Sequence, residues 1–207
     1  MRDEITAYKR ERILEEAVKL FYERGFSGTT LDDIAGKLGV TKPFIYTHFR
    51  SKVELLEAIC RPTIEMSLNA IAQAAGQDGP PGERLYKGIV EFAKVILVRQ
   101  ANIAVYFREE KHLSPEGLAE INALRKRFDR TLSEVLEEGV AAGVFRIADI
   151  RIAALVIGGM VSWAYTWYQP GGRLSLDDVA ATLAQFALQM VEAQGTQIQP
   201  AELAIQP

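Results

Sequence analysis

Signals for helix starts constrain the fold of this chain more than any other feature of its sequence. Three segments have the form S/T-x-x-D/E, in which a hydroxyl and an acidic side chain satisfy backbone N–H groups at the start of a helix: Thr30–Asp33, Ser51–Glu54 and Ser175–Asp178. Ser114 followed by Pro115 marks a fourth start, because proline fits the first helical position. Strand signals are nearly absent. The sequence therefore predicts an all-α protein.

Apolar residues at a spacing of three to four extend these starts into helices. Ile13, Ala17 and Leu20 follow this spacing, and Gly25 comes next as a C-cap. The clearest break is the Gly- and Pro-rich segment 77–82. The pattern predicts nine helices, at about 5–24, 31–38, 42–48, 52–75, 83–98, 101–112, 115–142, 149–168 and 176–193. We expect 195–207, rich in Gln and Pro, to be a frayed end.

The composition excludes several classes of protein. One Cys among 207 residues excludes a disulfide scaffold and a Cys-rich zinc module, and 25% charged residues exclude a low-complexity disordered chain. Residues 152–168 carry no charge, but a bilayer-spanning helix needs about 20 residues, so we expect a buried or interfacial helix and no membrane contact. The first residues lack the apolar core of a secretory signal, and we expect a cytoplasmic protein.

Charge is distributed unevenly along the chain. The net charge is −3, yet residues 1–52 carry ten Lys and Arg against eight Asp and Glu. Residues 36–52 contain no acidic residue, and their basic side chains are Lys37, Lys42, His48, Arg50 and Lys52. A basic segment on an acidic protein is a candidate for contact with phosphate, although four cations in seventeen residues are also typical of an ordinary solvated face.

Residues 31–50 have the spacing of a helix-turn-helix. A small core is expected from Ile34, Leu38, Val40 and Ile45. Gly39 stands where the first helix ends and a positive φ is convenient, and Thr41 opens the second helix as its N-cap. The second helix is left with an exposed face made of Phe44, Tyr46, Thr47 and His48. Such a helix can enter a DNA major groove, and a helical hairpin within a bundle is the alternative.

A larger set of residues between about 10 and 57 carries a family resemblance: Phe26, Thr29, Thr30, Ile34, Ala35, Leu38, Gly39, Val40, Ile45, Tyr46, His48, Phe49, Ser51, Lys52 and Leu55. Together these residues resemble the N-terminal signature of the TetR/AcrR family of transcriptional repressors. The resemblance implies a nine-helix, TetR-like homodimer, in which an N-terminal three-helix head binds a palindromic operator in double-stranded DNA. It also implies a larger helical body that binds a small effector.

The resemblance also implies which residues touch DNA. It assigns contacts with the DNA backbone to Tyr46, His48 and Lys52, with help from Thr29 and Thr30. It assigns base contacts to Thr41, Lys42, Pro43 and Phe44. Lys42 can equally contact a phosphate, and these two roles stay open. Thr47 departs from the family pattern, since many members carry a second aromatic residue there.

Residues 83–193 show no arrangement typical of catalysis or metal binding. Cys60 stands alone, and His112 has Glu109 and Glu110 nearby but no second ligand at helical spacing. We therefore expect no enzyme activity, no metal and no cofactor. Aromatic residues inside the helices stand out instead, and the predicted ligand site comprises Met66, Phe92, Tyr106, Phe107, Arg125, Phe128, Met160, Trp163 and Trp167. An ordinary aromatic core is the alternative for the two Trp.

The last two predicted helices carry regular stripes. In 149–168, one stripe of small residues consists of Ala154, Gly158, Ser162 and Thr166, and its neighbour consists of Leu155, Gly159, Trp163 and Trp167. Small residues at every fourth position permit close helix approach at a dimer seam or leave room for a ligand. The final helix has one apolar face made of Val179, Leu183, Phe186, Ala187 and Met190. We expect these two helices of each chain to form the homodimer interface.

Arg125 faces the body, because it lies about 60° from Phe128 on a helix with 100° per residue, whereas Lys126 and Arg130 point away. It either snorkels or pairs with Asp129, or it binds an anion or carbonyl of a ligand. More loosely, the segment 163–175 resembles that of family members controlling acyl, steroid or aromatic degradation, several of which respond to CoA thioesters. This implies an acyl-CoA effector, for which the candidate cations are Arg108, Lys111, Arg125 and Arg173.

These observations combine into one functional hypothesis. We expect residues 1–52 to form the helix-turn-helix DNA-binding domain and residues 53–207 to form the ligand-binding and dimerisation domain. The protein would be a repressor that leaves its operator when a small, largely apolar effector, such as an acyl-CoA, fills the body. The alternative is a helical protein that binds an apolar ligand, or an enzyme, without a role on DNA.

Overall fold

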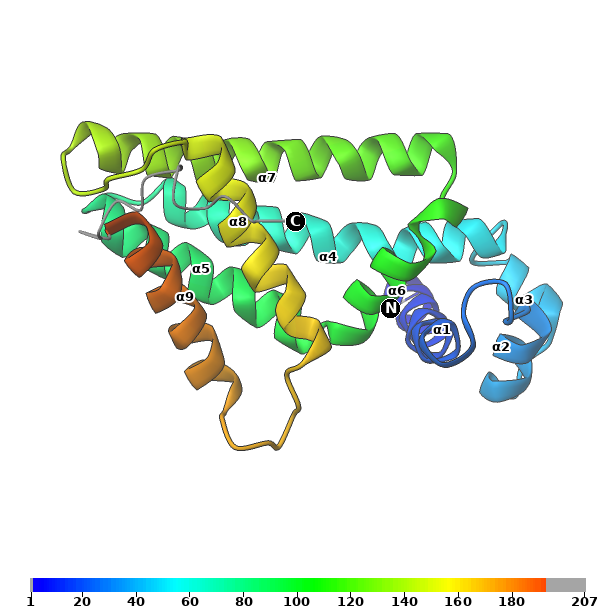
Figure 1. Cartoon of the computed structure of the whole chain (residues 1–207). Coiled ribbons are helices and arrows are strands. Elements are labelled where there is room, and N and C mark those ends of the chain that lie inside the picture. The colour runs from blue at the N-terminus through cyan, green and yellow to red at the C-terminus, as the bar shows by residue number, and fades with distance from the viewer. Residues whose placement is uncertain (1, 193–207) are drawn as a thin grey trace, which may run out of the picture.

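A computed structural model describes residues 2–192, and within that range the chain is entirely helical, as predicted (Figure 1). The nine α-helices are α1 (Arg2–Arg24), α2 (Leu31–Leu38), α3 (Lys42–Tyr46), α4 (Lys52–Ala75), α5 (Pro81–Val98), α6 (Gln100–Glu109), α7 (Pro115–Ala141), α8 (Ile150–Ser162) and α9 (Leu176–Glu192). Two short 3-10 helices, η1 (Glu110–His112) and η2 (Trp163–Thr166), follow α6 and α8. The segment 195–207, for which a frayed end is predicted, lies outside the described residues.

The predicted helix starts are confirmed by their caps. The hydroxyls of Thr30, Ser51 and Ser114 accept hydrogen bonds from the backbone three residues ahead, and Ser175 does the same for α9. Gly39 ends α2 with a φ of 67°, a conformation that favours glycine. The caps explain why the positions of most helices could be predicted from the sequence alone.

Helices α3, α6 and α8 end at least two residues earlier than predicted, and the segment after α6 forms η1. The α-helical part of the 149–168 segment stops at Ser162, where the chain tightens into η2. Gln100 holds this end against α6, since its side-chain amide donates to the carbonyls of Tyr165 and Tyr168. In the same way α3 stops at Tyr46, and the Thr47 hydroxyl donates to the Phe44 carbonyl in a closing turn.

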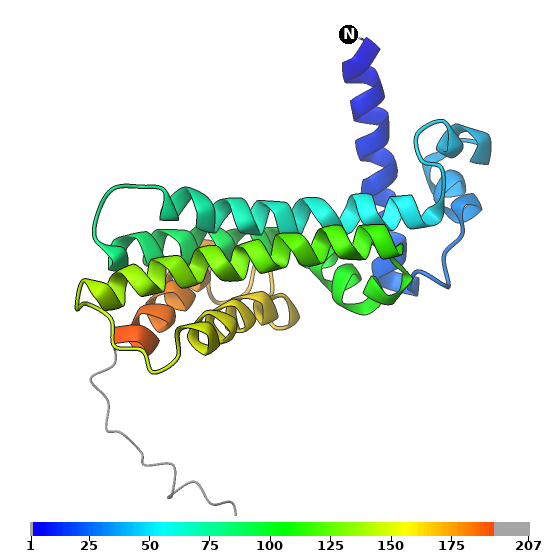
Figure 2. The same cartoon turned by 90° about the horizontal axis from the view of Figure 1, so that it is seen from above.

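The long helices α4, α5 and α7 lie side by side and make the frame of the body, with α8 and α9 packed on one side of it (Figures 1 and 2). Helices α1 to α3 form a head at one end of α4, and α1 extends away from the body in the view of Figure 2. Helix α6 lies between the head and the body, and it packs against both α1 and α4. None of the described helices is both long enough and apolar enough to cross a membrane.

Buried side chains form two hydrophobic clusters. One fills the body and includes Phe92 and Phe128. The other fills the head, but it extends into α4 through Leu55 and Ile59 and into α6 through Tyr106. The head is therefore joined to the first helix of the body by a shared core, which crosses the predicted boundary at residue 52.

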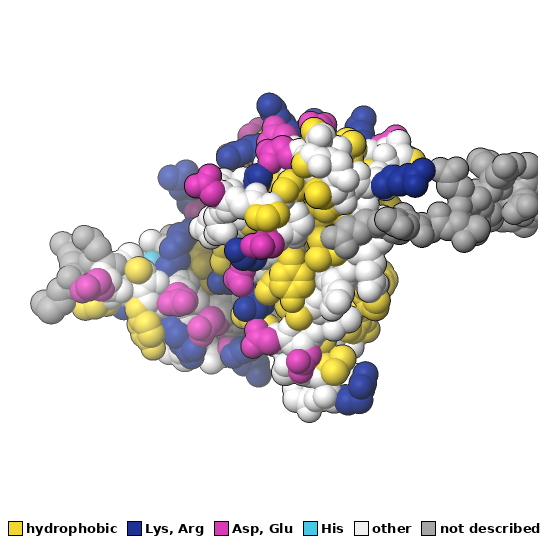
Figure 3. Space-filling model, turned by 90° about the vertical axis from the view of Figure 1, so that its left-hand side faces the viewer, with side chains coloured by type: hydrophobic (Ala, Val, Ile, Leu, Met, Phe, Trp, Pro, Cys, Tyr) yellow, Lys and Arg dark blue, Asp and Glu magenta, His cyan; other side chains and the backbone are white. Residues whose placement is uncertain are grey.

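The predicted dimer face of α9 is only partly available. Val179, Leu183 and Ala187 are buried in the core of their own protomer, which corrects their assignment, because this side of α9 packs on α5. Phe186 and Met190 remain exposed, as do apolar side chains on α8. Figure 3 shows the end of the body on the left of Figure 1, where hydrophobic side chains gather in the middle of the face and most charged ones surround them.

The packing of Gly139 generates a prediction about stability. A Cβ at this position in α7 would lie 1.9 Å from a ring carbon of the buried Phe145. Gly139→Ala is therefore expected to lower the free energy of unfolding by about 1–3 kcal/mol, the usual cost of overpacking. Gly36→Ala in α2 is the matched control, since its Cβ would meet nothing within 4 Å. The control should raise stability by about 0.5–1 kcal/mol.

Urea unfolding followed by circular dichroism, at one fixed protein concentration, measures both values. A Gly139→Ala variant as stable as its Gly36→Ala counterpart would contradict the packing described for the end of α7.

Candidate functional site

The first candidate site is the exposed face of α3. Ile45 and Phe49 are buried and fix the helix on the head, while Tyr46 points outward with half of its side chain exposed. Thr41 precedes α3 as its N-cap but makes no capping hydrogen bond with its side chain. Lys42 and Pro43 are exposed beside it. The predicted contact residues of α3 thus share one accessible surface.

Lys42 is held by a neighbour from the preceding helix. Its Nζ lies 2.7 Å from a carboxylate oxygen of Asp32, and both side chains are largely exposed. The hydrogen bond from Lys42 to Asp32 raises the pKa of Lys42. Lys42 is therefore charged, and any contact it makes with DNA must replace this exposed ion pair, which is weak in solvent.

His48 lies at the junction between α3 and α1. Its ring meets the ring of Phe44 edge-on at 5.1 Å, and its carbonyl accepts a 2.6 Å hydrogen bond from Arg10. Burial lowers the pKa of His48, and the nearby charges of Lys9 and Arg10 lower it further. In the absence of DNA these effects favour the neutral imidazole, which has one N–H donor.

The predicted DNA contact of the Thr29 side chain is wrong. Thr29 is completely buried, and its hydroxyl lies 2.9 Å from the carbonyl of Gly25 and 3.2 Å from that of Leu20. A buried hydroxyl that caps the end of α1 cannot reach a phosphate. Thr30 is exposed, but its hydroxyl and N–H are both paired with the carboxylate of Asp33, which lowers the pKa of Asp33.

Lys52 has a structural role that the sequence did not reveal. Its Nζ donates to the carbonyls of Phe26 and Thr29, each at 2.8 Å, and lies 4.2 Å from the centre of the Phe26 ring. These contacts clamp the turn between α1 and α2 onto the start of α4. One ammonium proton remains beyond these two hydrogen bonds.

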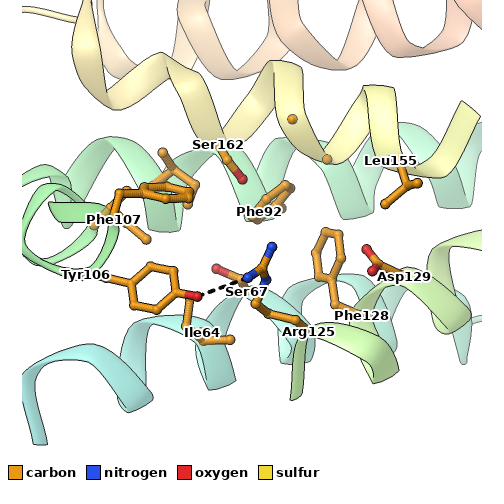
Figure 4. Close-up of a pocket in the computed structure, with 14 residues that line it drawn as sticks. Ile64, Ser67, Phe92, Tyr106, Phe107, Arg125, Phe128, Asp129, Leu155 and Ser162 are labelled. Atoms are coloured by element: carbon orange, nitrogen blue, oxygen red, sulfur yellow. Dashed lines mark hydrogen bonds between the residues drawn. The ribbon is translucent and has the colours of Figure 1, made fainter. Parts of the chain in front are cut away.

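The second candidate site is a cavity of about 240 Å³ enclosed by α4, α5, α6, α7 and α8 (Figure 4). Five of the nine predicted ligand residues line it: Phe92, Tyr106, Phe107, Arg125 and Phe128. The sequence reasoning missed Ile64, Ser67, Ile96, Ile103 and Asp129, and Leu155 lies on one of the two stripes described for 149–168. Gly158, Gly159 and Ser162 also line it, and they belong to the stripes of 149–168 that were expected to leave room for a ligand or to form a dimer seam.

Four predicted ligand residues, Met66, Met160, Trp163 and Trp167, do not line this cavity. Trp163 and Trp167 are 62% and 51% exposed. Their assignment assumed a continuous α-helix, but the α-helix ends at Ser162, and Trp163 begins the 3-10 helix η2. Met160 packs instead against the body core.

Arg125 is directed into the cavity, as Figure 4 shows, and its Nη1 donates to the Tyr106 hydroxyl at 3.1 Å. Among the ion pairs of the described residues, none joins Arg125 to Asp129, so the expected structural pair is not formed. Burial raises the pKa of Tyr106 and, separately, that of Asp129. The cavity therefore combines apolar walls with one guanidinium, one neutral phenol and one carboxyl group.

The other predicted cations lie elsewhere. Arg108 donates to the carbonyls of Phe21 and Tyr22 and pairs with Glu109, so it fastens α6 to the end of α1. Lys111 and Arg173 do not line the cavity. In the part of the chain that the structure describes, no group of three or more His, Cys, Asp and Glu could hold a metal ion.

Two family models match the chain. Residues 13–59 match "Bacterial regulatory proteins, tetR family", and residues 78–191 match "Tetracyclin repressor-like, C-terminal domain". The HTH-type transcriptional repressor KstR2 of Mycolicibacterium smegmatis is 30% identical over 175 residues, covering 84% of this chain and 85% of the relative. The first match contains α2 and α3, and the second contains most of the cavity.

Solved structures have the same fold. The TetR-family regulator PfmR from Thermus thermophilus is 32% identical with a TM-score of 0.80, covering 86% of this chain and 97% of that one. A structure of AibR in complex with isovaleryl coenzyme A and operator DNA is 27% identical with a TM-score of 0.73. It covers 88% of this chain and 97% of that one.

The buried carboxyl group of Asp129 generates a prediction about pH. Burial outweighs the favourable charges of Arg125 and Arg151, so the folded pKa lies above the ordinary 3.8. The ionised group therefore costs stability, and this cost is absent below the unfolded pKa and grows as pH rises toward the folded pKa. Asp129→Asn should raise the melting temperature at pH 7 by no more than about 2–4 °C, and the gain should shrink near pH 4.

Asp78→Asn, at an exposed acid in the turn between α4 and α5, is the control and should have little effect at either pH. If the Asp129→Asn variant melts at a lower temperature than the wild type at pH 7, the attraction of Arg125 and Arg151 for the Asp129 carboxylate outweighs the cost of its burial.

Proposed function

The chain belongs to the TetR family of bacterial regulatory proteins and is a ligand-responsive transcriptional repressor that binds DNA, and we propose that it acts in the cytoplasm as a homodimer whose effector is an acyl-coenzyme A. The observation that carries the proposal is an apolar cavity that contains one arginine side chain and lies in a helical body next to a helix-turn-helix head. Helix α6 lines this cavity and packs against α1 of the head. In this proposal residues 1–52 bind DNA, and residues 53–207 bind the effector and dimerise without catalysing a reaction.

The proposed DNA surface is built around α3. Tyr46 and His48 donate to phosphates, and Lys52 offers its remaining ammonium proton while it holds the turn between α1 and α2. Bases are contacted by Thr41, Lys42, Pro43 and Phe44, the residues nearest the start of the helix. Thr30 supports this surface by capping α2, and it makes no base contact.

The proposed dimer interface combines α8 and α9. Ile152 and Val156 of α8 are exposed, as are Phe186 and Met190 of α9. A symmetric four-helix contact between two chains buries these side chains from water, which is the main favourable term in such association. The two heads are then related by a two-fold axis.

The proposed effector matches the cavity in size and chemistry. Water occupies about 30 Å³ per molecule in the liquid, so 240 Å³ holds a group about as large as eight waters, such as a short acyl chain. Phe92 and Phe128, whose ring centres are 4.7 Å apart, supply an apolar wall, and Arg125 can donate to the thioester carbonyl. The likeness to AibR, named for its complex with isovaleryl coenzyme A, supports this class of ligand.

Helix α6 is the proposed route from ligand to DNA. It lines the cavity with Ile103, Tyr106 and Phe107, and its end is fastened to α1 by Arg108. The effector must bind the DNA-incompatible arrangement more tightly than the DNA-binding one, since a ligand without differential affinity shifts no equilibrium. By linkage, operator DNA must weaken effector binding by the same factor.

The first functional prediction concerns the operator. Selection of bound sequences from a random DNA pool should yield an inverted repeat, because two heads related by a two-fold axis read inverted half-sites one or more helical turns apart. Footprinting of the selected sequence should show protection of both halves. Protection of a single half-site by a monomer would contradict the dimeric arrangement.

The second functional prediction concerns the effector. In calorimetry with a panel of acyl-CoAs from isovaleryl-CoA to longer and aromatic chains, at least one should bind and release the selected operator. Arg125→Gln should weaken that binding by about 1–3 kcal/mol, or roughly 5- to 150-fold, because it removes a charged hydrogen bond. Tyr106→Phe should weaken it less, since a neutral hydroxyl is lost.

Arg127→Gln is the matched control, because Arg127 is an exposed cation two residues along the same helix that does not line the cavity. It should leave effector binding and operator binding unchanged. If Arg125→Gln and Arg127→Gln bind the effector equally well, Arg125 is not a ligand contact. If no acyl-CoA of the panel binds to the wild type, an effector of these classes is excluded.

A further inference from the structure

A second hollow adjoins the ligand cavity on the outer side of α7 and α8. It measures about 590 Å³ and is lined from α7 by Lys126, Asp129 and Arg130 and from α8 by Arg151 and Leu155. Asp129 and Leu155 line the cavity as well. The side chains of Asp129 and Leu155 therefore border both hollows, which lie next to each other.

The α7 side of this groove comes from the densest run of cations in the sequence. Residues 125–130 contain four Lys and Arg and one Asp, of which Lys126, Asp129 and Arg130 line the groove, and Arg151 lines it from α8. Among the ion pairs of the described residues, none involves Lys126 or Arg151. Arg130 pairs with Glu134 at 3.0 Å, but the arginine side chain is 81% exposed, so this pair is weak and readily exchanged.

Three acidic residues, Asp129, Glu137 and Asp149, also line the groove. Of these, only Asp129 also lines the cavity, so cations outnumber acids in the part of the groove next to the cavity. Asp149 is engaged in capping α8, where it accepts a 2.9 Å hydrogen bond from the N–H of Ile152. Glu137 lies near the end of α7, beside the turn that leads to α8. Asp129 is the acid at the junction, and the charges of Arg125 and Arg151 both act on its carboxyl group.

The size of the cavity leaves room for only one part of the proposed effector. The cavity of about 240 Å³ accommodates an acyl group, whereas coenzyme A is several times larger and carries phosphates that an apolar wall cannot accept. The nucleotide half of the effector must therefore lie outside the cavity. The sequence alone suggested Arg108, Lys111 and Arg173 as cations for it, but none of these lines the cavity or the groove.

We propose that the groove between α7 and α8 binds the phosphates of the nucleotide half of the effector through Lys126, Arg130 and Arg151, while the acyl group fills the cavity. This inference rests on the proposed function. The linker between the two halves passes Leu155, and its amide N–H groups donate to the carboxylate of Asp129. The groove thereby selects thioesters of coenzyme A over the corresponding free acids.

The test compares ligands with and without phosphates. Isovaleryl-CoA and isovaleryl-pantetheine, which lacks the nucleotide and all phosphates, are titrated into the wild type and the Lys126→Gln/Arg151→Gln double variant. The wild type should bind the CoA thioester at least about tenfold more tightly, with a stronger dependence on salt. The double variant should lose most of this difference, while its affinity for the pantetheine thioester should be unchanged.

Three controls isolate the groove. Arg127→Gln changes charge by one unit beside the groove and should retain the preference for the CoA thioester. Adenosine 3′,5′-bisphosphate should compete with isovaleryl-CoA for the wild type but not for the double variant, and adenosine 5′-diphosphate tests whether an unattached nucleotide suffices. Binding of adenosine 5′-diphosphate as tight as that of isovaleryl-CoA would overturn the assignment to an acyl-CoA.

The outcomes separate this inference from the proposed function. If acyl thioesters release the operator, but phosphates and groove cations make no difference to affinity, the groove assignment is wrong and the proposed function stands. If no thioester of the acyl-CoA panel binds, with or without phosphates, both proposals are overturned together.

Discussion

The burial of Tyr106 joins the ligand cavity to the core of the DNA-binding head. Its ring belongs to the hydrophobic cluster that contains Phe21 and Ile34 of the head, and it also lines the cavity in the body. Its hydroxyl meets Arg125 at 3.1 Å, so the same side chain is fixed from both sides. Because packed cores switch between discrete arrangements and do not deform continuously, the proposed shift of Tyr106 would act on the head by repacking this shared cluster.

Polar contacts at the end of α6 reinforce this link. Arg108 binds two carbonyls at the end of α1, and the buried Glu109 lies between Arg108 and His112. The ring of His112 stacks on Phe26 at 4.8 Å, and Lys52 covers the same ring at 4.2 Å. Phe26 thus touches one residue from η1, which follows α6, and one from α4. These contacts set the angle between head and body, since they connect the turn after α1 to two helices that reach the cavity.

Local chemistry explains what the sequence could predict. Capping residues such as Ser51 and the glycine that ends α2 act through neighbours in the sequence, so helix starts and the helix-turn-helix could be located. The role of Thr29 could not be predicted, because it depends on how the end of α1 packs against the Thr29 hydroxyl. Trp163 and Trp167 were wrongly assigned to the ligand site, and they lie where the α-helix changes to a 3-10 helix. The buried apolar side chains of α9 were wrongly assigned to the dimer interface, because a periodic apolar face does not show whether it packs on the same chain or on a second chain.

The free energy needed for the proposed switch is similar in size to the contribution of one hydrogen bond to a charged group. Coupling between sites typically amounts to about 1–3 kcal/mol, and a hydrogen bond to a charged group contributes about 1.5–3 kcal/mol. An effector carbonyl that accepts from Arg125 takes the donor that now faces Tyr106. In the proposed switch the Tyr106 hydroxyl gives up this contact, and because its ring is packed in the head core, any adjustment of the ring acts on that core. Under this proposal, effector binding and the displacement of the head start from the same exchange at Arg125.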